Sequence, residues 1–600
     1  MFVFIIGTTL LAIPFIFIGL FTDKKRGFLY ILSFSLFFHT LLAFFLQIFG
    51  IFHYWTVFVG TLIAEIFVFI FLLKKGLFKR YSFNVSEISW IVFFVVIISA
   101  VYLFYVHYNY TGKIGVINNG VLGKAYIENM SYPYPYFSDE WYAVSLIKGT
   151  IETKSLPFYN ILNGGFFLNL QFFTHSLLSQ IVVLLGLDPL IHYSFLIIIF
   201  NTLIILVGFI FLRLCGLSET VSAISSLSIL YITCASNLPG IWHLIPISFG
   251  IFFFLLGLCF MEIKDLKMIF ISFFFVSLFY TLLAPFFITA IITFLFINYK
   301  EKILIILKYW KYYILALIVG MIGLILMVFI FPILQRVISY IISRLFFISF
   351  TKDFIQDNNL LNIFPIYILP LATIGIYLLF KNKKWIFFTM IICFAYWFLY
   401  SFIIYRIIID FERVVYFTAI LITLSAGFGL EYLFNLIIKK FKNEGEKVIK
   451  FAGILMLIFF VFAIPNYTQS RKWDKLVLTN YKTNAKMYAQ PPANRYLISD
   501  DLKIFENIKE KRFLSLPWKG TVIGIATKNY PVVVKEGNIV IGDIKDPGIF
   551  ISSNCEKKTE MAKKMKLDYV YMPPFNCPGF EKISESSEGL ILYKFYDKNY

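Results

Sequence analysis

The stretch that decides the fold is residues 190–212, LIHYSFLIIIFNTLIILVGFIFL, a run of 23 residues that contains no Asp, Glu, Lys or Arg. As a helix, such a run is long enough to cross the hydrocarbon layer of a bilayer, which is about 30 Å thick. Comparable apolar runs recur along the 600-residue chain, which is 60% hydrophobic. The sequence therefore predicts a multi-pass α-helical membrane protein, and the first apolar run, from Met1, is expected to be a retained span.

The basic residues lie mostly in short loops between these runs. The formal net charge of +19 could indicate nucleic-acid binding, but clustering in loops is typical of the positive-inside rule instead. We therefore expect no nucleic-acid partner, and we expect each cluster to face the cytoplasm. The clusters are Lys24, Lys25 and Arg26; Lys74, Lys75, Lys79 and Arg80; Lys264 and Lys267; Lys300 and Lys302; Lys381, Lys383 and Lys384; and Lys439, Lys440 and Lys442.

This charge pattern predicts about fourteen transmembrane helices, with both termini outside the cytoplasm. The pair that flanks Pro285 is short, so one broken element there would change the count. The apolar run 166–187 contains Asn169, His175 and Gln180, and it fits only as a helix lying along the outer membrane surface. The predicted spans are 1–21, 28–49, 55–73, 88–106, 190–212, 220–236, 244–261, 268–283, 285–298, 312–331, 364–380, 385–402, 412–436 and 449–465.

Two domains follow from this map. Residues 1–465 form a transmembrane domain whose outer loop spans 108–189, and residues 466–600 form a small extracytoplasmic α/β domain. In the latter we expect helices at 500–511, with Ser499 as N-cap, and at 557–566. Strands are expected at 568–572 and 589–595. Cys555 and Cys577 share this oxidising compartment, so they form either a disulfide or two unrelated thiols.

One concentrated polar segment interrupts the apolar sequence, Tyr132–Tyr142 (YPYPYFSDEWY), and it contains the adjacent acids Asp139 and Glu140. Carboxylates are costly to hold close to hydrocarbon, so a functional role is the first hypothesis. The alternative is a helix from Ser138 to Lys148, ended by Gly149, whose first turn simply favours acids because of the helix dipole.

Motifs of several enzyme classes are missing from the sequence. It contains no GxxxxGK[ST] phosphate loop, no GxGxxG, no HExxH and no CxxC. The six histidines are scattered, so no metal site is predicted from the residues. Any chemistry must therefore use carboxylates, arginines and polar loop residues at the outer membrane surface.

The order of these features resembles the GT-C superfamily of integral-membrane glycosyltransferases, which use polyprenyl-phosphate-linked sugars. The resemblance covers most of the membrane region. It begins with Asp139-Glu140 and continues through the stretch Thr150–Asn160 and the segment Leu184–Pro189. It ends with Glu412–Tyr416, which leads into Ser425–Leu430.

The sequence departs from the oligosaccharyltransferase branch of that superfamily. In place of a Trp-Trp-Asp motif it offers only Lys472-Trp473-Asp474, and the loop Asn237–His243 lacks the metal-binding acids of that branch. Transfer of a whole oligosaccharide to asparagine is therefore disfavoured. A divalent metal is a cofactor that the resemblance leaves open.

The resemblance implies transfer of a sugar from a polyprenyl-phosphate donor to a glycan, lipid or protein acceptor. The phosphate is a stabilised leaving group, so one base and a cation for the phosphate suffice, and direct displacement inverts the anomeric carbon. We expect Asp139 to be the base and Glu140 to support it. Trp141, Trp242 and His243 are expected to line the substrate cavity, although an interfacial aromatic belt explains Trp242 and His243 equally well.

Four arginines are expected at the outer membrane edge, against the charge bias: Arg336, Arg344, Arg406 and Arg413. Arginine binds phosphate in bidentate fashion, so we expect them to hold the donor phosphate, Arg413 foremost. Pairing with Asp410 and Glu412, or with lipid headgroups, is the alternative.

A second class of function remains open, that of a transporter or flippase for a lipid-linked saccharide. Such proteins usually place polar residues in the middle of several spans, often in inverted repeats. Here the polar residues gather at one face, which favours surface chemistry in the cell membrane. A purely structural envelope protein would not explain the acids at 139 and 140.

Overall fold

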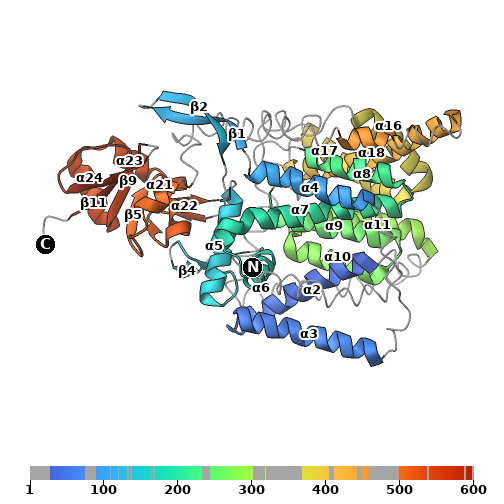
Figure 1. Ribbon diagram of the computed structural model, residues 1–600, viewed down its shortest axis with the longest axis horizontal. Helices are drawn as coiled ribbons and strands as arrows, with labels where there is room; N and C mark the ends of the chain where they lie inside the picture. Colours follow the sequence, from blue (N-terminus) through green and yellow to red (C-terminus); the bar gives the residue numbers. More distant parts are fainter. Residues whose placement is uncertain are drawn as a thin grey trace.

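The computed structural model shows a bundle of long apolar helices with a separate α/β domain at one end (Figure 1). Residues 1–26, which include the first expected span, and most of 302–367, which include the span expected at 312–331, lie outside the described part. The described residues are 27–74, 90–108, 110–118, 121–130, 134–135, 138–162, 164–166, 169, 171–232, 243–301, 318, 368–403, 411–441, 448, 451–458, 497, 499–536, 539–586 and 589–596.

Apolar helices build the membrane domain. The described ones are α2 (Gly27–Ile48), α3 (Tyr54–Lys74), α4 (Trp90–Tyr108), α7 (Pro189–Leu214), α8 (Glu219–Leu227), α9 (Pro246–Glu262), α10 (Leu266–Phe279), α11 (Ala284–Asn298), α16 (Ile368–Asn382), α17 (Lys384–Ile403) and α18 (Phe411–Phe441). Four stretches are long and apolar enough to cross a membrane: Phe28–Ile48, Pro189–Leu214, Thr281–Asn298 and Val414–Phe441. The predicted count of about fourteen spans stays a prediction.

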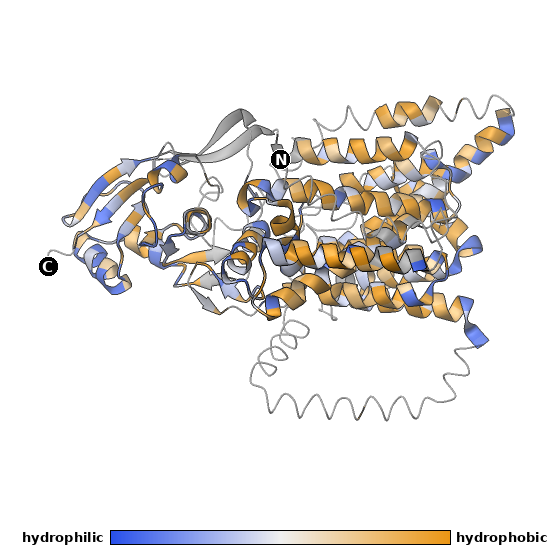
Figure 2. Ribbon diagram, turned by 60° about the horizontal axis from the view of Figure 1, so that its bottom comes forward, coloured by the Kyte–Doolittle hydropathy of each residue, from blue (hydrophilic) through white to orange (hydrophobic). Residues whose placement is uncertain are grey.

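Hydrophobic residues dominate these helices (Figure 2), and many of their large apolar side chains are exposed. Phe67 and Trp90, for example, are 74% and 76% exposed. Soluble proteins rarely expose apolar surface on this scale, whereas lipid tails cover it without cost. The chain is therefore a helical membrane protein.

One expected span differs from its prediction. Residues 220–236 were expected to cross the membrane, but α8 has nine residues and is followed by a 3-10 turn, Ser228–Tyr231. Nine residues of helix are only about 14 Å long. Serine hydroxyls explain part of this, because Ser226 and Ser228 donate to the carbonyls of Ala223 and Ile224.

The segment around Pro285 forms two elements. Phe273 of α10 and Phe287 of α11 have ring centroids 5.9 Å apart, so the chain turns back between them at the 3-10 turn Thr281–Leu283. Pro285 lies in the first turn of α11, where its missing N–H is not needed. The structure therefore contains two separate helices here, as predicted, and not one broken element.

The lysine-rich turns meet at one end of the bundle. Lys383, between α16 and α17, pairs with Glu262 at the end of α9, and Tyr30 at the start of α2 donates to Asp265 over 2.5 Å. The start of α9 lies at the other end, three residues after His243. Figure 2 shows hydrophilic residues at the helix ends farthest from the C-terminal domain. The bundle thus has a lysine-rich end and an opposite end beside that domain.

The segment between α4 and α7 covers this second end. It contains the hairpin of β1 (Tyr110–Asn118) and β2 (Val121–Met130), then α5 (Ser138–Thr153), the short strands β3 (Tyr159–Asn160) and β4 (Gly165–Phe166), and α6 (Phe172–Leu185). In Figure 1, α6 is seen nearly end-on while the long helices run across the view. It lies across their direction, as expected for residues 166–187, although it is shorter than that range.

The C-terminal domain has a five-stranded sheet of order β10-β11-β9-β5-β6. Its β5 pairs in parallel with β6 and β9, and β11 pairs antiparallel with β9 and β10. The elements are α21 (Ser499–Ile504), β5 (Arg512–Ser515), α22 (Pro517–Thr527), β6 (Tyr530–Pro531), β7 (Val534–Glu536), β8 (Ile539–Ile541), α23 (Asp546–Ser552), α24 (Cys555–Met565), β9 (Tyr569–Met572), β10 (Phe580–Glu585) and β11 (Ile591–Phe595).

The predicted helix at 557–566 and strands at 568–572 and 589–595 correspond to α24, β9 and β11. The helix predicted at 500–511 is wrong in length, since α21 ends at Ile504 and β5 begins at Arg512. An acidic residue of α21 lies in the core of the domain: Asp501 accepts a hydrogen bond from Tyr571 and pairs with the buried Lys519 at 2.6 Å. Cys555 and Cys577 form a disulfide, with Cα atoms 5.3 Å apart.

Candidate functional site

Helix α5 brings Asp139 and Glu140 to the end of the bundle opposite the lysine-rich turns. Both lie in its first turn, where the helix dipole favours negative charge. Glu140 is fully buried, and Asp139 is half-buried. Successive helical residues point about 100° apart, so the two carboxylates face different surroundings.

Glu140 pairs with His243 in the buried interior. Its Oε1 lies 2.5 Å from Nδ1 of His243, and both side chains are 0% exposed. The imidazole and the carboxylate thus share one short hydrogen bond. Burying two polar side chains costs desolvation free energy, which only a hydrogen bond of good geometry between them offsets. The pair therefore fixes the start of α5 against the segment that precedes α9.

The main chain at His243 is itself held by two membrane helices. Asn201 of α7 and Ser248 of α9 donate to the His243 carbonyl over 3.2 and 2.7 Å. Tyr193 of α7 donates to the next carbonyl, that of Leu244, over 2.6 Å. The partner of Glu140 is thus a rigid position, set by hydrogen bonds from both sides.

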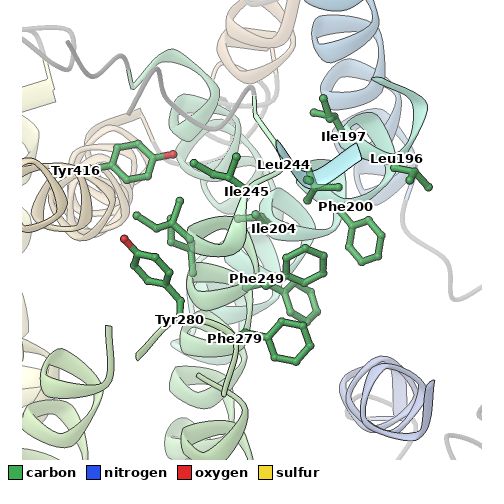
Figure 3. Close-up of a cluster of buried hydrophobic side chains, with 14 of the residues drawn as sticks. Leu196, Ile197, Phe200, Ile204, Leu244, Ile245, Phe249, Phe279, Tyr280 and Tyr416 are labelled. Atoms are coloured by element: carbon green, nitrogen blue, oxygen red, sulfur yellow. The ribbon is translucent and has the colours of Figure 1, made fainter. Parts of the chain in front are cut away.

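Apolar packing completes this support. Figure 3 shows Leu244 and Ile245 in one cluster with Phe200 and Ile204 of α7 and with Tyr416 of α18. All five are buried. Tyr416 is in the second turn of α18, so the start of this helix belongs to the same cluster as the segment after His243. Arg413 lies three residues earlier, in the first turn, and its side chain is outside the described part.

The other predicted site residues have different places. Trp141 is a core residue, 2% exposed, and its indole N–H has no hydrogen-bond partner within the described residues. Its predicted role in a substrate cavity stays a prediction. Trp242, Arg336, Arg344 and Arg406 lie outside the described residues, and so do Lys472–Asp474.

Helix α5 is longer than the alternative hypothesis held, because it continues through Gly149 to Thr153. A Cβ at Gly149 would lie 2.8 Å from the carbonyl oxygen of Tyr159, so glycine allows β3 to approach the helix. Gly149 is therefore a packing residue and does not end the helix.

The loop after α5 is fixed by its own polar residues. Asn160 accepts from the N–H of Leu162 over 3.0 Å, which closes a turn. Asn169 donates to the carbonyl of Pro157 over 3.1 Å and to Nδ1 of His175 over 3.0 Å. Burial lowers the pKa of His175 to about 3, which keeps the imidazole neutral. These amides stabilise the loop in the structure.

The polar segment also approaches the start of α7. Asp188 caps this helix, accepting from the N–H of Leu190 over 2.7 Å. Burial, together with the negative charge of Asp188, raises the pKa of Tyr134. Among the described residues, no group of three His, Cys, Asp or Glu could hold a metal ion.

The chain matches no family model and no curated protein. It is similar to two solved structures of the Archaeoglobus fulgidus oligosaccharyltransferase. One, tethered with an acceptor peptide containing the NVT sequon, has a TM-score of 0.43 and 12% identity, over 80% of this chain and 68% of that one. The other, a complex with Zn and sulfate, has a TM-score of 0.41 and 14% identity, over 84% and 73%.

The pairing of Glu140 with His243 is not predicted from the sequence, in which His243 is expected only to line the substrate cavity. The one signal for it is the acid, because a buried carboxylate requires a cation or a hydrogen-bond donor as its partner. The few histidines in the outer loops are the candidates for that partner. A pair separated by 103 residues has no local signature.

Proposed function

We propose that the chain transfers a sugar from a polyprenyl-phosphate-linked donor to an acceptor hydroxyl at the end of the bundle where α5 begins. The observation that supports this most is that the two adjacent acids have different surroundings. Glu140 pairs with His243 and anchors the helix, while Asp139, one residue earlier, is only half-buried, and successive helical residues lie about 100° apart around the axis. A fixed carboxylate at the edge of an apolar bundle suits chemistry on a lipid-borne substrate.

In this reaction Asp139 is the general base. It takes the proton of the acceptor hydroxyl as the acceptor oxygen forms its bond to the anomeric carbon. The bond from that carbon to the phosphate oxygen breaks, and its electron pair leaves with the polyprenyl phosphate. The displacement inverts the anomeric carbon. The acceptor is a glycan, lipid or protein, and the reaction end of the bundle faces away from the cytoplasm in the cell membrane.

Arg413 is proposed to bind the donor phosphate. Tyr416, in the second turn of α18, shares a cluster with Ile245 and the segment that begins at His243, so the backbone at the start of α18 lies at the same end of the bundle as the acids. A guanidinium there would neutralise the charge that grows on the departing phosphate. Arg336, Arg344 and Arg406 are proposed as further phosphate ligands only because they are expected at the outer membrane edge, against the charge bias of the loops.

Proteoliposomes containing the full-length protein and synthetic polyprenyl-phosphate hexoses and pentoses test this function. With a membrane extract as acceptor source, we expect free polyprenyl phosphate to appear together with a glycosylated product, both seen by mass spectrometry. If the donor instead crosses the bilayer with its sugar still attached, the protein is a flippase and the proposal is wrong.

A further inference from the structure

The C-terminal domain contacts α5, the helix that bears the acids, through the end of one of its own helices. In Figure 1, α22 lies next to α5, at the junction of the two domains. The last carbonyls of any helix have no partner inside that helix, and its C-terminal end has partial negative charge. In α22 these carbonyls begin at Ile525, and Lys528, a residue in left-handed conformation with φ of 60°, caps the helix after Thr527.

Lys148 of α5 binds this helix end. Its Nζ donates to the Ile525 carbonyl over 2.8 Å, so a cation meets both an orphan acceptor and the negative pole of α22. Burial lowers the pKa of Lys148, while the negative charges of Asp188 and Glu152 act against that shift. This part-buried ammonium donates to one defined carbonyl, so the contact is specific, unlike those of the solvated lysines elsewhere on the surface.

Glu152 adds a second contact on the same face of α5. It is four residues after Lys148, so both side chains lie on one side of the helix. Its Oε1 lies 2.8 Å from Nζ of Lys528, the residue that caps α22. Both side chains of this ion pair are partly exposed, so it contributes less than the hydrogen bond between Lys148 and the Ile525 carbonyl.

A third contact is apolar. Leu162, in the loop after α5, is buried, and a Cβ added to Gly524 of α22 would lie 2.8 Å from its Cδ2 atom. The last turn of α22 therefore packs directly on the loop that follows α5. Charge, hydrogen bonding and close packing all converge on one helix end.

The position of these contacts around α5 is informative. Lys148 is nine residues after Asp139 and Glu152 is thirteen, which places them about 180° and 220° around the helix axis from Asp139. The C-terminal domain therefore holds α5 from the side opposite the proposed base. Glu140 and His243 hold the same helix at its start, about 12 Å away along the axis from Lys148.

We infer that Lys148 is a positioning residue, through which the C-terminal domain sets the orientation of α5 and hence the place of Asp139. The inference rests on the proposed function for its catalytic consequence, but the contact itself does not. Core packing buries α5 along most of its length and limits its movement, and the Lys148 hydrogen bond adds a directional contact near the far end of the helix. Losing that contact changes how this end of α5 is held, and a shift that displaces a base by about 1 Å is enough to slow a reaction severely.

Lys148→Met tests this, because it keeps the length of the side chain and removes the donor and the charge. In the full-length protein, hydrogen exchange measured by mass spectrometry should rise at least about tenfold in the peptide containing residues 148–153. The rate constant kcat for sugar transfer should fall by roughly 10²-fold. The KM for the donor should stay within about twofold, since no donor contact is lost. Lys557→Met, which removes an exposed lysine of the same domain paired with Glu560, is the matched control and should change none of these.

Charge reversal keeps the test open if Lys148→Met fails to fold. Glu152→Lys and Lys528→Glu should each raise exchange in that peptide, and the double variant should restore it along with kcat. If exchange stays at the wild-type level in Lys148→Met and in both reversals, α22 does not hold α5 and the inference is wrong. If exchange rises while kcat is unchanged, the contact is structural only, and the positioning role is wrong even though sugar transfer stands. A wild-type protein without any transfer overturns the proposed function, and the exchange data then report on the contact alone.

Discussion

Breaking the Glu140–His243 pair should destabilise the protein strongly. Both side chains are 0% exposed and their atoms lie 2.5 Å apart, so removing one partner leaves the other buried without its bond. For buried pairs this costs about 3–5 kcal/mol in the free energy of unfolding. We therefore expect Glu140→Ala and His243→Ala each to lose a large part of the stability.

The double variant distinguishes the pair from two separate packing defects. Once both groups are gone, neither is left buried without the other, so Glu140→Ala/His243→Ala should cost at least about 1 kcal/mol less than the sum of the single changes. Unfolding in detergent titrated with SDS and followed by tryptophan fluorescence measures these free energies. Glu556→Ala, an acid in the first turn of the exposed helix α24, is the control for the helix-dipole effect. Additivity within about 0.5 kcal/mol would refute the coupling.

Three further predictions follow from the site and its surroundings. The folded protein keeps His175 neutral with a pKa of about 3, so protons bind the unfolded state first as the pH falls below about 6.5. Stability should then fall by up to about 1.4 kcal/mol per pH unit from this group, and His175→Gln should remove that slope in unfolding titrations between pH 7 and 5. Arg413→Lys should retain donor binding but lose turnover, and Arg413→Ala should lose both; full activity of the alanine variant beside inactive Arg336 or Arg344 variants would move the phosphate site. Cysteines placed at Lys74 and Asn480 should be labelled from opposite faces of the membrane, and labelling from one face would contradict the topology.

The membrane helices could be predicted from sequence to within a few residues where one apolar run makes one helix. The span expected at 55–73 is α3, Tyr54–Lys74, and that at 190–212 is α7, Pro189–Leu214. Asp188 and Pro189 mark the start of α7 as a cap and a first-turn proline. Such signals are local, so a single sequence contains them.

The misses have a common cause. Apolar composition around residue 225 reports burial, but the serines there bond to the preceding turn and α8 stays short. In the alternative hypothesis Gly149 ends a helix, while its role in the structure depends on Tyr159, which packs against it. The Glu140–His243 pair and the Lys148–Ile525 contact join residues 103 and 377 positions apart. Contacts of this kind follow from the whole fold, which local pattern does not encode.

The central claim, that Asp139 is the base for sugar transfer, is tested most directly by Asp139→Asn in single-turnover assays with a polyprenyl-phosphate sugar. The variant keeps the size and polarity of the side chain but cannot take a proton. Transfer should slow by roughly 10²–10⁴-fold while donor binding stays near the wild-type level, and Glu556→Gln should leave both unchanged. Near-normal turnover of Asp139→Asn would contradict the account.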